Sequence, residues 1–75
     1  MKTTVADLKV GEKCIVENVP LKSVPLKLLE MGCLPGKELE LLHIAPLKDP
    51  LYIKVNGSHL AIRKETARLI TVNKK

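Results

Sequence analysis

The sequence predicts a mainly β protein, a small curled β-barrel of about five short strands with one helix at about residues 23–31 and a short helical turn near the C-terminus. Three observations predict it: short runs alternate apolar with polar residues, an Asn-Gly pair marks a tight hairpin, and one segment has clear helical periodicity. The 75 residues are enough for one domain, spanning 1–75. Closing the barrel would also cover the edges that so small a sheet exposes.

Ahead of the helix, the chain is expected to form a lead-in and a first full strand. Residues 4–8 fit a short helical turn or an extended segment. Residues 12–19 mix β-branched and polar side chains, as strands do. Pro20 ends this strand, because proline has no N–H to donate to a neighbouring strand.

The helix is expected at 23–31. Ser23 can cap its N-terminus, and Pro25 fits the first turn, where backbone N–H groups need no partner within the helix. Three apolar residues fall on one helical face: Val24, Leu28 and Met31. Gly32 supplies the left-handed residue that commonly follows a helix, and a proline shortly after it prevents continuation.

The later elements are expected in this order: a strand at 38–45, a loop at 46–50, a strand at 51–55, a return strand around Leu60 and Ile62, a helical turn at 63–69 and a last strand at 70–72. Asn56-Gly57 joins the two middle strands as a tight hairpin, since both turn positions favour positive φ. Leu41 and Leu42 are adjacent, so the apolar side chains switch faces there. That switch indicates burial on both sides or a bulge in a strongly bent strand.

The composition excludes several classes of function. Tyr52 is the only aromatic residue, whereas modules that bind single-stranded nucleic acid or proline-rich peptides use several aromatic side chains. One residue in three is Leu, Ile or Val, and a chain this small needs nearly all of them in its core. Little is left for a deep ligand cavity. The sequence therefore predicts a protein that is not an enzyme and has no catalytic residue.

The net charge of +5 is spread along the chain, mostly with acidic residues nearby. A protein that binds nucleic acid more often gathers its cations in one stripe. Solvated surface charge is therefore favoured over a site for an anionic polymer, and no nucleic-acid partner is expected.

Two distant cysteines, Cys14 and Cys33, fit buried reduced thiols better than a disulfide framework, since secreted domains of this size usually carry several disulfides. The polar opening residues lead us to expect no signal peptide, and no apolar run is long enough to cross a membrane. These features predict a cytoplasmic protein that does not insert into a membrane.

Five residues are conventional candidates for metal ligands: Cys14, Cys33, His43, Asp49 and His59. None has the close paired spacing that pre-organises a tetrahedral site, so no metal site and no cofactor are predicted. Segment 32–38 superficially resembles a phosphate-binding loop. It has three residues between its glycines instead of four, and Glu38 stands where a hydroxyl is needed, so a simple turn is predicted.

The loop at 46–50 is more apolar than an isolated barrel requires. Its two prolines lower the entropic cost of docking, and Leu47 could anchor a partner. Leu47 could equally fold back and cap the barrel. The sequence leaves both alternatives open.

Four segments, in their order and spacing, resemble the FeoA family of small cytosolic proteins in bacterial ferrous-iron uptake: 8–12, 27–36, 45–51 and 60–67. Segment 27–36 is similar to the family's helix and Gly-x-x-Pro-Gly turn, and segment 45–51 to its proline loop. Two residues depart from the family pattern, which commonly has Arg where this chain has Lys27 and Gly where it has Lys48. The resemblance implies an SH3-like barrel without catalysis of its own, acting beside FeoB, a membrane transporter with a cytosolic GTP-binding domain.

The leading hypothesis is a binding module that docks on the cytosolic part of a FeoB-type ferrous-iron transporter. Its expected surface comprises Lys22, Lys27, Glu30, Pro46, Leu47 and Tyr52. Two alternatives stay open: a nucleic-acid-binding or regulator-type SH3-like module, motivated by the charge, and an Fe²⁺ sensor or carrier that uses the cysteines or histidines. The sequence also leaves open weak pairing between copies, and whether the protein stimulates GTP hydrolysis, assembles the transporter or gates it.

Overall fold

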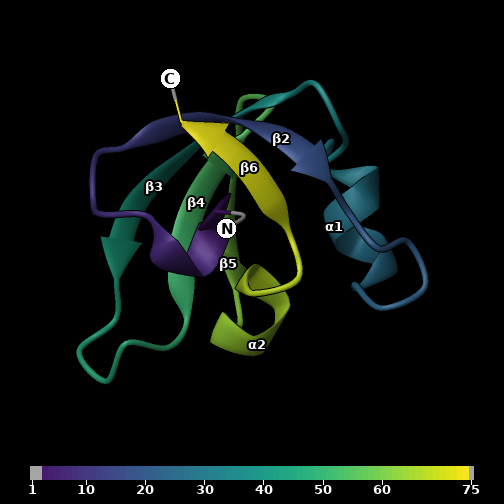
Figure 1. Cartoon of the computed structure of the whole chain (residues 1–75). Coiled ribbons are helices and arrows are strands. Elements are labelled where there is room, and N and C mark those ends of the chain that lie inside the picture. Colours follow the sequence, from purple (N-terminus) through teal and green to yellow (C-terminus); the bar gives the residue numbers. More distant parts are fainter. Residues whose placement is uncertain (1–2, 75) are drawn as a thin grey trace.

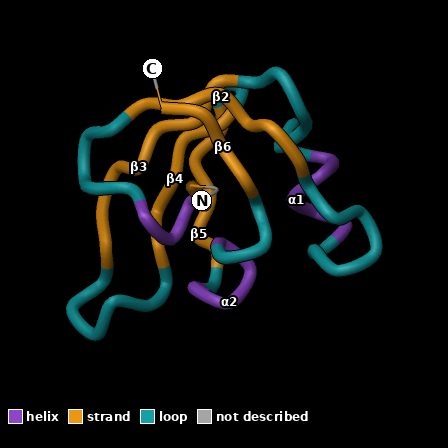
Figure 2. Tube along the Cα trace, viewed as in Figure 1, coloured by secondary structure: helices purple, strands orange, loops and turns teal. Residues whose placement is uncertain are grey.

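One antiparallel sheet organises the structure, a computed structural model that describes residues 3–74 (Figures 1 and 2). Two short α-helices and one 3₁₀ turn, η1, connect its strands. The elements are β1 (Thr3–Thr4), η1 (Val5–Asp7), β2 (Lys13–Asn18), α1 (Leu26–Glu30), β3 (Glu38–Ile44), β4 (Leu51–Val55), β5 (Ser58–Ile62), α2 (Lys64–Ala67) and β6 (Thr71–Lys74). The mainly β prediction is confirmed.

The six strands follow the order β1-β6-β2-β3-β4-β5. Every neighbouring pair is antiparallel, and β6 inserts between β1 and β2. Figure 1 shows the sheet curling over the core, with α1 on one side and α2 below. Because β1 and β5 end the sheet, the expectation that closure leaves no edge is wrong.

The hairpin between β4 and β5 forms as its sequence predicts. Asn56 and Gly57 have φ of 51° and 80°, the positive values of a type I′ turn. Val55 lies opposite Ser58, so the loop has two residues. Along β4, buried and exposed side chains alternate strictly, which places Tyr52 and Lys54 on the outer face.

Of the two alternatives that the sequence left open for β3, the bulge is confirmed. Leu41 lies opposite Ile53, but His43 lies opposite Tyr52, so Leu42 is the extra residue. Leu41 is fully buried and Leu42 half-buried. A bulge bends the strand and increases its twist, which helps so short a sheet to wrap its core.

The core is apolar throughout. Among residues 3–74, no polar or charged residue belongs to the buried core, although the Oγ1 of half-buried Thr71 is enclosed without a hydrogen bond. The buried side chains are Val5, Leu8, Cys14, Val16, Val19, Val24, Leu28, Cys33, Leu39, Leu41, Leu51, Ile53, Val55, Ile62, Ala67, Ile70 and Val72. They come from nearly every element, so the sheet and both helices share one core.

The helix α1 is shorter than the sequence predicts, and Ser23 does not cap it. Pro25 is the N-cap residue, with extended ψ of 137°, and the helix begins at Leu26. A residue before proline is driven out of the helical region, so Val24 cannot continue a helix that starts at Ser23. The Ser23 N–H instead donates to the Pro20 carbonyl at 2.9 Å, closing a separate turn.

The strand count is six rather than five, because a two-residue strand, β1, pairs with the start of β6. A pair of residues is too short to carry an alternating pattern, so the sequence gives no sign of it. The following 3₁₀ turn is fixed by Asp7, whose carboxylate accepts from the Thr4 backbone N–H at 2.9 Å. The same hydrogen bond lowers the pKa of Asp7.

Candidate docking surface

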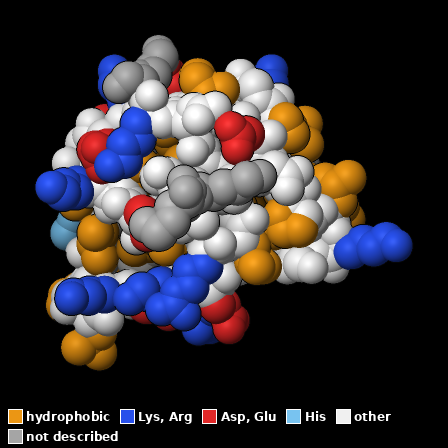
Figure 3. Space-filling view, viewed as in Figure 1, with side chains coloured by type: hydrophobic (Ala, Val, Ile, Leu, Met, Phe, Trp, Pro, Cys, Tyr) orange, Lys and Arg blue, Asp and Glu red, His pale blue; other side chains and the backbone are white. Residues whose placement is uncertain are grey.

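The segment around α1 exposes leucines that the fold does not use. Leu21 and Leu26 are 63% and 68% exposed, whereas Leu28 is buried. Three charged residues are exposed on the same segment: Lys22, Lys27 and Glu30. In Figure 3 apolar side chains gather on the right of the molecule, where Figure 1 places α1. We call Leu21, Lys22, Leu26, Lys27 and Glu30 the α1 surface.

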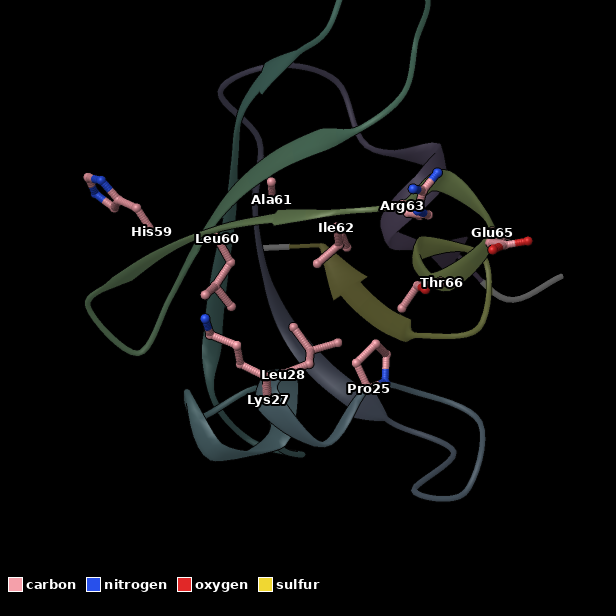
Figure 4. A pocket seen from close by; sticks show the side chains of 10 residues that line it. All are labelled: Pro25, Lys27, Leu28, His59, Leu60, Ala61, Ile62, Arg63, Glu65 and Thr66. Atoms are coloured by element: carbon pink, nitrogen blue, oxygen red, sulfur yellow. The ribbon is translucent and has the colours of Figure 1, made fainter.

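A groove of about 480 Å³ lies between α1, β5 and α2. Its lining residues are Pro25, Lys27, Leu28, His59, Leu60, Ala61, Ile62, Arg63, Glu65 and Thr66. Figure 4 shows Leu60 and Ile62 of β5 pointing toward Leu28 of α1. Lys27 lies at one end of the groove, and Arg63 and Glu65 lie at the α2 end. The middle of the groove is therefore apolar, and charged groups lie at both ends.

Tyr52 lies on the outer face of β4, opposite His43. The two rings are 5.7 Å apart between centroids and tilted by 32°, within the range of a favourable aromatic pair. Both line a shallow depression together with His59, Leu60 and Ala61, which also line the groove. Strand β5 thus separates the depression of Tyr52 from the groove of Lys27.

Leu47 does not fold back onto the barrel. It is 91% exposed, so the capping alternative is wrong. The loop closes on itself instead: the Lys48 N–H donates to the Ala45 carbonyl at 2.7 Å, and the Ala45 N–H donates to the Pro50 carbonyl at 3.1 Å. These bonds leave the tip of the loop pointing outward.

The structure separates the six residues that the sequence suggested for docking. Lys22, Lys27 and Glu30 belong to the α1 surface, and β5 lies between them and Tyr52. Pro46 and Leu47 lie in the β3–β4 loop, which Figure 1 places at the lower left, away from α1 at the right. One continuous surface containing all six is therefore not formed.

Sequence reasoning did not single out Leu21, Leu26 or Leu60. A signal was present for Leu26, which does not fall on the helical stripe of Val24, Leu28 and Met31, whereas Leu21 precedes the expected helix. For Leu60 the sequence showed only an alternating strand. Its place beside a groove depends on β5 ending the sheet, which is a property of the whole topology.

The cysteines are buried free thiols, as the sequence predicts. Desolvation raises the pKa of Cys14 and of Cys33 to about 11. The Cys14 Sγ also donates to the Leu39 carbonyl at 3.5 Å. Because a metal binds the thiolate, neutral buried thiols are poor ligands near neutral pH.

The remaining metal-ligand candidates lie elsewhere. His43 and His59 are exposed on β3 and β5, and Asp49 is engaged in the fold, where its Oδ1 accepts from the Lys64 N–H at 2.9 Å. Within the described part of the chain, no group of three or more His, Cys, Asp or Glu side chains is placed to hold a metal ion.

The turn after α1 has no free donors for a phosphate. Its backbone N–H groups all donate to carbonyls of the fold: Gly32 to Leu29, Cys33 to Leu28, Leu34 to Gly32, Gly36 to Val16 and Lys37 to Leu34. A phosphate-binding loop needs such groups unpaired and convergent. The predicted structural turn is confirmed.

Across residues 3–74, no helix is long and apolar enough to span a bilayer.

The curled sheet and its short helices define the chain as an SH3-like protein. The zinc-complexed FeoA of Stenotrophomonas maltophilia, described as an SH3 domain protein, has this fold: the TM-score is 0.79 at 24% identity over 95% of this chain and 89% of that one. A family model for the FeoA domain matches residues 3–74. The chain belongs to the FeoA family, and the resemblance drawn from its sequence is confirmed.

Two further relatives are similar in sequence. The FeoA protein of Chlorobium tepidum is 32% identical, with a TM-score of 0.85 over 96% of this chain and 70% of that one. A fusion of Fe²⁺ transport protein A with the Fe²⁺ transporter FeoB, from Porphyromonas gingivalis, is 32% identical over 68 residues. This match covers 89% of the present chain but only 8% of the fusion protein.

Proposed function

We propose that this chain is a non-enzymatic accessory module of ferrous-iron uptake that works in the cytoplasm and docks on the cytosolic part of a FeoB-type transporter. The observation that carries the proposal is the Porphyromonas gingivalis fusion, in which a related segment and FeoB form one chain. A covalent link holds two modules at high effective concentration. A separate module needs a docking surface to achieve the same proximity.

The α1 surface supports this proposal best. Exposed leucines beside cations give an apolar anchor with a charged rim, the arrangement that protein interfaces commonly have. Its solvent-facing leucines contribute little to the core, since Leu28 is the buried residue of α1. A docking role would account for leucines that folding does not require.

The exposed leucines also supply a matched experiment. Leu26→Asp and Leu47→Asp place the same charge on two solvent-exposed leucines in different parts of the molecule. A calorimetric titration with the cognate transporter's cytosolic domain measures the affinity of both variants and of the wild type. We expect Leu26→Asp to weaken binding at least tenfold, Lys27→Glu severalfold, and Leu47→Asp little.

The outcomes separate the parts of the proposal. Loss of binding with Leu47→Asp alone moves the docking site to the β3–β4 loop. Equal affinity for all variants removes both surfaces, and no binding by the wild type removes the docking function itself. Anisotropy with labelled oligonucleotides at low salt and anaerobic calorimetry with Fe²⁺ then decide between the two alternatives that the sequence left open.

A further inference from the structure

Strand β5 ends the sheet with an unprotected edge. Natural edge strands are usually shortened or carry Lys, Pro or a bulge, which discourages other strands from pairing. The other end of the sheet, β1, has only two residues. In contrast, β5 has five residues, Ser58–Ile62, none of which is Lys, Pro or acidic, and its register with β4 is regular.

The register shows which backbone groups of β5 face outward. Leu41 lies opposite Ile53, yet its N–H and C=O bond to Glu12 and Gly11 on the other side. Since antiparallel pairs alternate, Ile53 turns its backbone groups toward β5 and pairs with Leu60. The backbone N–H and C=O groups of His59 and Ala61 therefore point away from β4, along the free edge.

The groove lies directly beside this edge. Leu60 and Ile62 point into it from β5, and Leu28 and Pro25 form the facing wall (Figure 4). Ala61 points to the opposite side of β5 in the same view. A strand added along β5 would place alternate side chains over the groove, because side chains alternate between faces along a strand.

The charges around the groove favour an acidic occupant. Lys27 lies at one end of the groove, and Arg63 lies at the other end of β5, where Figure 4 shows its side chain on the Ala61 side of the strand and Glu65 beside it. The whole chain carries a net charge of +5, so a second copy would bring the same cations to the same place. An extended segment with carboxylates near its ends complements both cations, whereas self-pairing is opposed by repulsion.

We propose that the β5 edge accepts an extended segment of the docking partner as an additional strand, with apolar side chains at alternate positions and acidic side chains near its ends. Hydrogen bonds to His59 and Ala61 supply the backbone pairing, and the groove selects the side chains. The inference rests on the proposed function for the identity of the partner. It adds the partner's conformation and chemistry.

Amide hydrogen exchange tests the pairing directly. We expect the N–H groups of His59 and Ala61 to exchange at least tenfold more slowly when the transporter's cytosolic domain is bound. The N–H groups of Leu60 and Ile62, which face β4, serve as internal controls and should change little. A nine-residue peptide of alternating Val and Glu is the second probe, and its matched control is N-methylated on the pairing side.

Two pairs of variants test the same contacts by affinity. Ala61→Pro removes an outward N–H at a position where an edge strand tolerates proline, and Ala61→Val keeps it. Lys27→Glu reverses a charge at the groove, whereas Lys37→Glu does so at an exposed lysine that neither lines the groove nor belongs to the α1 surface. The first member of each pair should lose at least tenfold in affinity for the peptide, and the second less than threefold. The exchange measurement on the wild type does not depend on these variants folding.

Each result decides a different statement. If the cytosolic domain binds while exchange at His59 and Ala61 stays unchanged, strand addition is overturned and docking stands. If the domain fails to bind but the peptide slows exchange at both residues, the edge stands and its assignment to the transporter falls. Concentration-dependent protection without any partner overturns the proposal in favour of self-pairing, and binding of the N-methylated peptide equal to the parent overturns it outright.

Discussion

The two short helices are held to the molecule in different ways. The first backbone N–H of α2 donates to Asp49 of the β3–β4 loop, Ala67 is fully buried, and the helix packs against η1. In contrast, the N-cap residue of α1 is Pro25, whose side chain has no acceptor to offer, and Leu28 is the buried residue of this helix. The turn that follows α1, which begins at Gly32, is its second attachment: the N–H groups of Gly32 and Cys33 donate to carbonyls of the helix.

From this difference we expect α2 to contribute mainly to stability and α1 mainly to binding. The contacts of α2 tie distant parts of the chain together, so changing them should reduce stability. The exposed leucines of α1 contact little of the fold, so changing them should leave stability nearly unaltered and reduce binding. By the same reasoning, substitutions in the turn after α1 should reduce stability more than substitutions in α1 itself.

The largest effect is expected for Gly32→Ala. Gly32 has φ of +99°, and a Cβ there would lie 2.5 Å from the Asn56 side-chain nitrogen. The left-handed backbone and the overlap together should cost about 2–4 kcal/mol of unfolding free energy, measured by urea titration. Because α1 has few other attachments, its amide protons should also exchange faster.

Gly36→Ala is the matched control for this experiment. Gly36 has a similar φ of +92°, but no atom lies within 4 Å of the added Cβ. It should therefore cost only the backbone part, about 1–2 kcal/mol. Adding Asn56→Gly to Gly32→Ala should recover the steric part; equal losses for Gly32→Ala and Gly36→Ala would contradict the role of Asn56 in fixing the end of α1.

A second prediction concerns Cys33, the first core residue after α1. Its folded pKa of about 11 lies above the ordinary value of 9.0, and Cys14 behaves alike. A raised folded pKa gives stability that is complete below pH 9 and is lost as the pH rises toward 11, because the unfolded thiols release protons first. Each thiol should cost about 1 kcal/mol of unfolding free energy between pH 8 and 10.

Cys33→Ala isolates this contribution. Whatever it costs at neutral pH, the variant should lose stability less steeply between pH 9 and 10 in urea titrations at each pH. An unchanged slope would show that the Cys33 thiol does not cause the loss of stability. It would also mean that water reaches the core beside α1, so that α1 is attached even more loosely than the contrast with α2 assumes.

Local sequence signals predicted the elements that local physics determines. The Asn56-Gly57 hairpin follows from positive φ, and the bulge at Leu42 follows from the switch of apolar residues between faces. The predicted start of α1 is wrong, because the prediction gave more weight to Ser23 as a helix cap than to the restriction that Pro25 places on the backbone of Val24. Both rules are local, but the proline restriction is steric and overrides the preference.

The candidate docking surface was only partly predictable, because it depends on contacts distant in sequence. Lys27 and Glu30 could be suggested from the helix alone. The groove forms because β5 ends the sheet beside α1. The order of strands in a sheet cannot be read from the pattern of Ser58–Ile62. Leu47 shows the same limit: the loop's own hydrogen bonds decide that its side chain points outward.

A third, smaller effect tests the attachment of α2. Asp49→Ala removes the 2.9 Å hydrogen bond to the Lys64 N–H and leaves that donor without its partner. A lost helix cap costs about 0.5–2 kcal/mol, so a decrease of about 1 kcal/mol is expected on thermal or urea unfolding. Asp49→Asn keeps an acceptor and should retain most of the stability. The affinity for the transporter domain should stay within twofold in both variants; a tenfold loss would show that the α2 side also takes part in docking.

The smallest effect is expected for Lys48→Gly, at a residue that precedes Asp49 and has φ of 67°. Lys48→Gly relieves a left-handed backbone but makes the unfolded chain more flexible, and the two contributions nearly cancel, leaving a change within about 0.5 kcal/mol. Lys48→Val, with a β-branched side chain at positive φ, should lose about 1 kcal/mol or more. A gain above 1 kcal/mol for Lys48→Gly would mean that the fold bears an uncompensated strain to keep this cation beside the exposed Leu47. The β3–β4 loop, rather than the α1 surface, would then be the stronger candidate for docking.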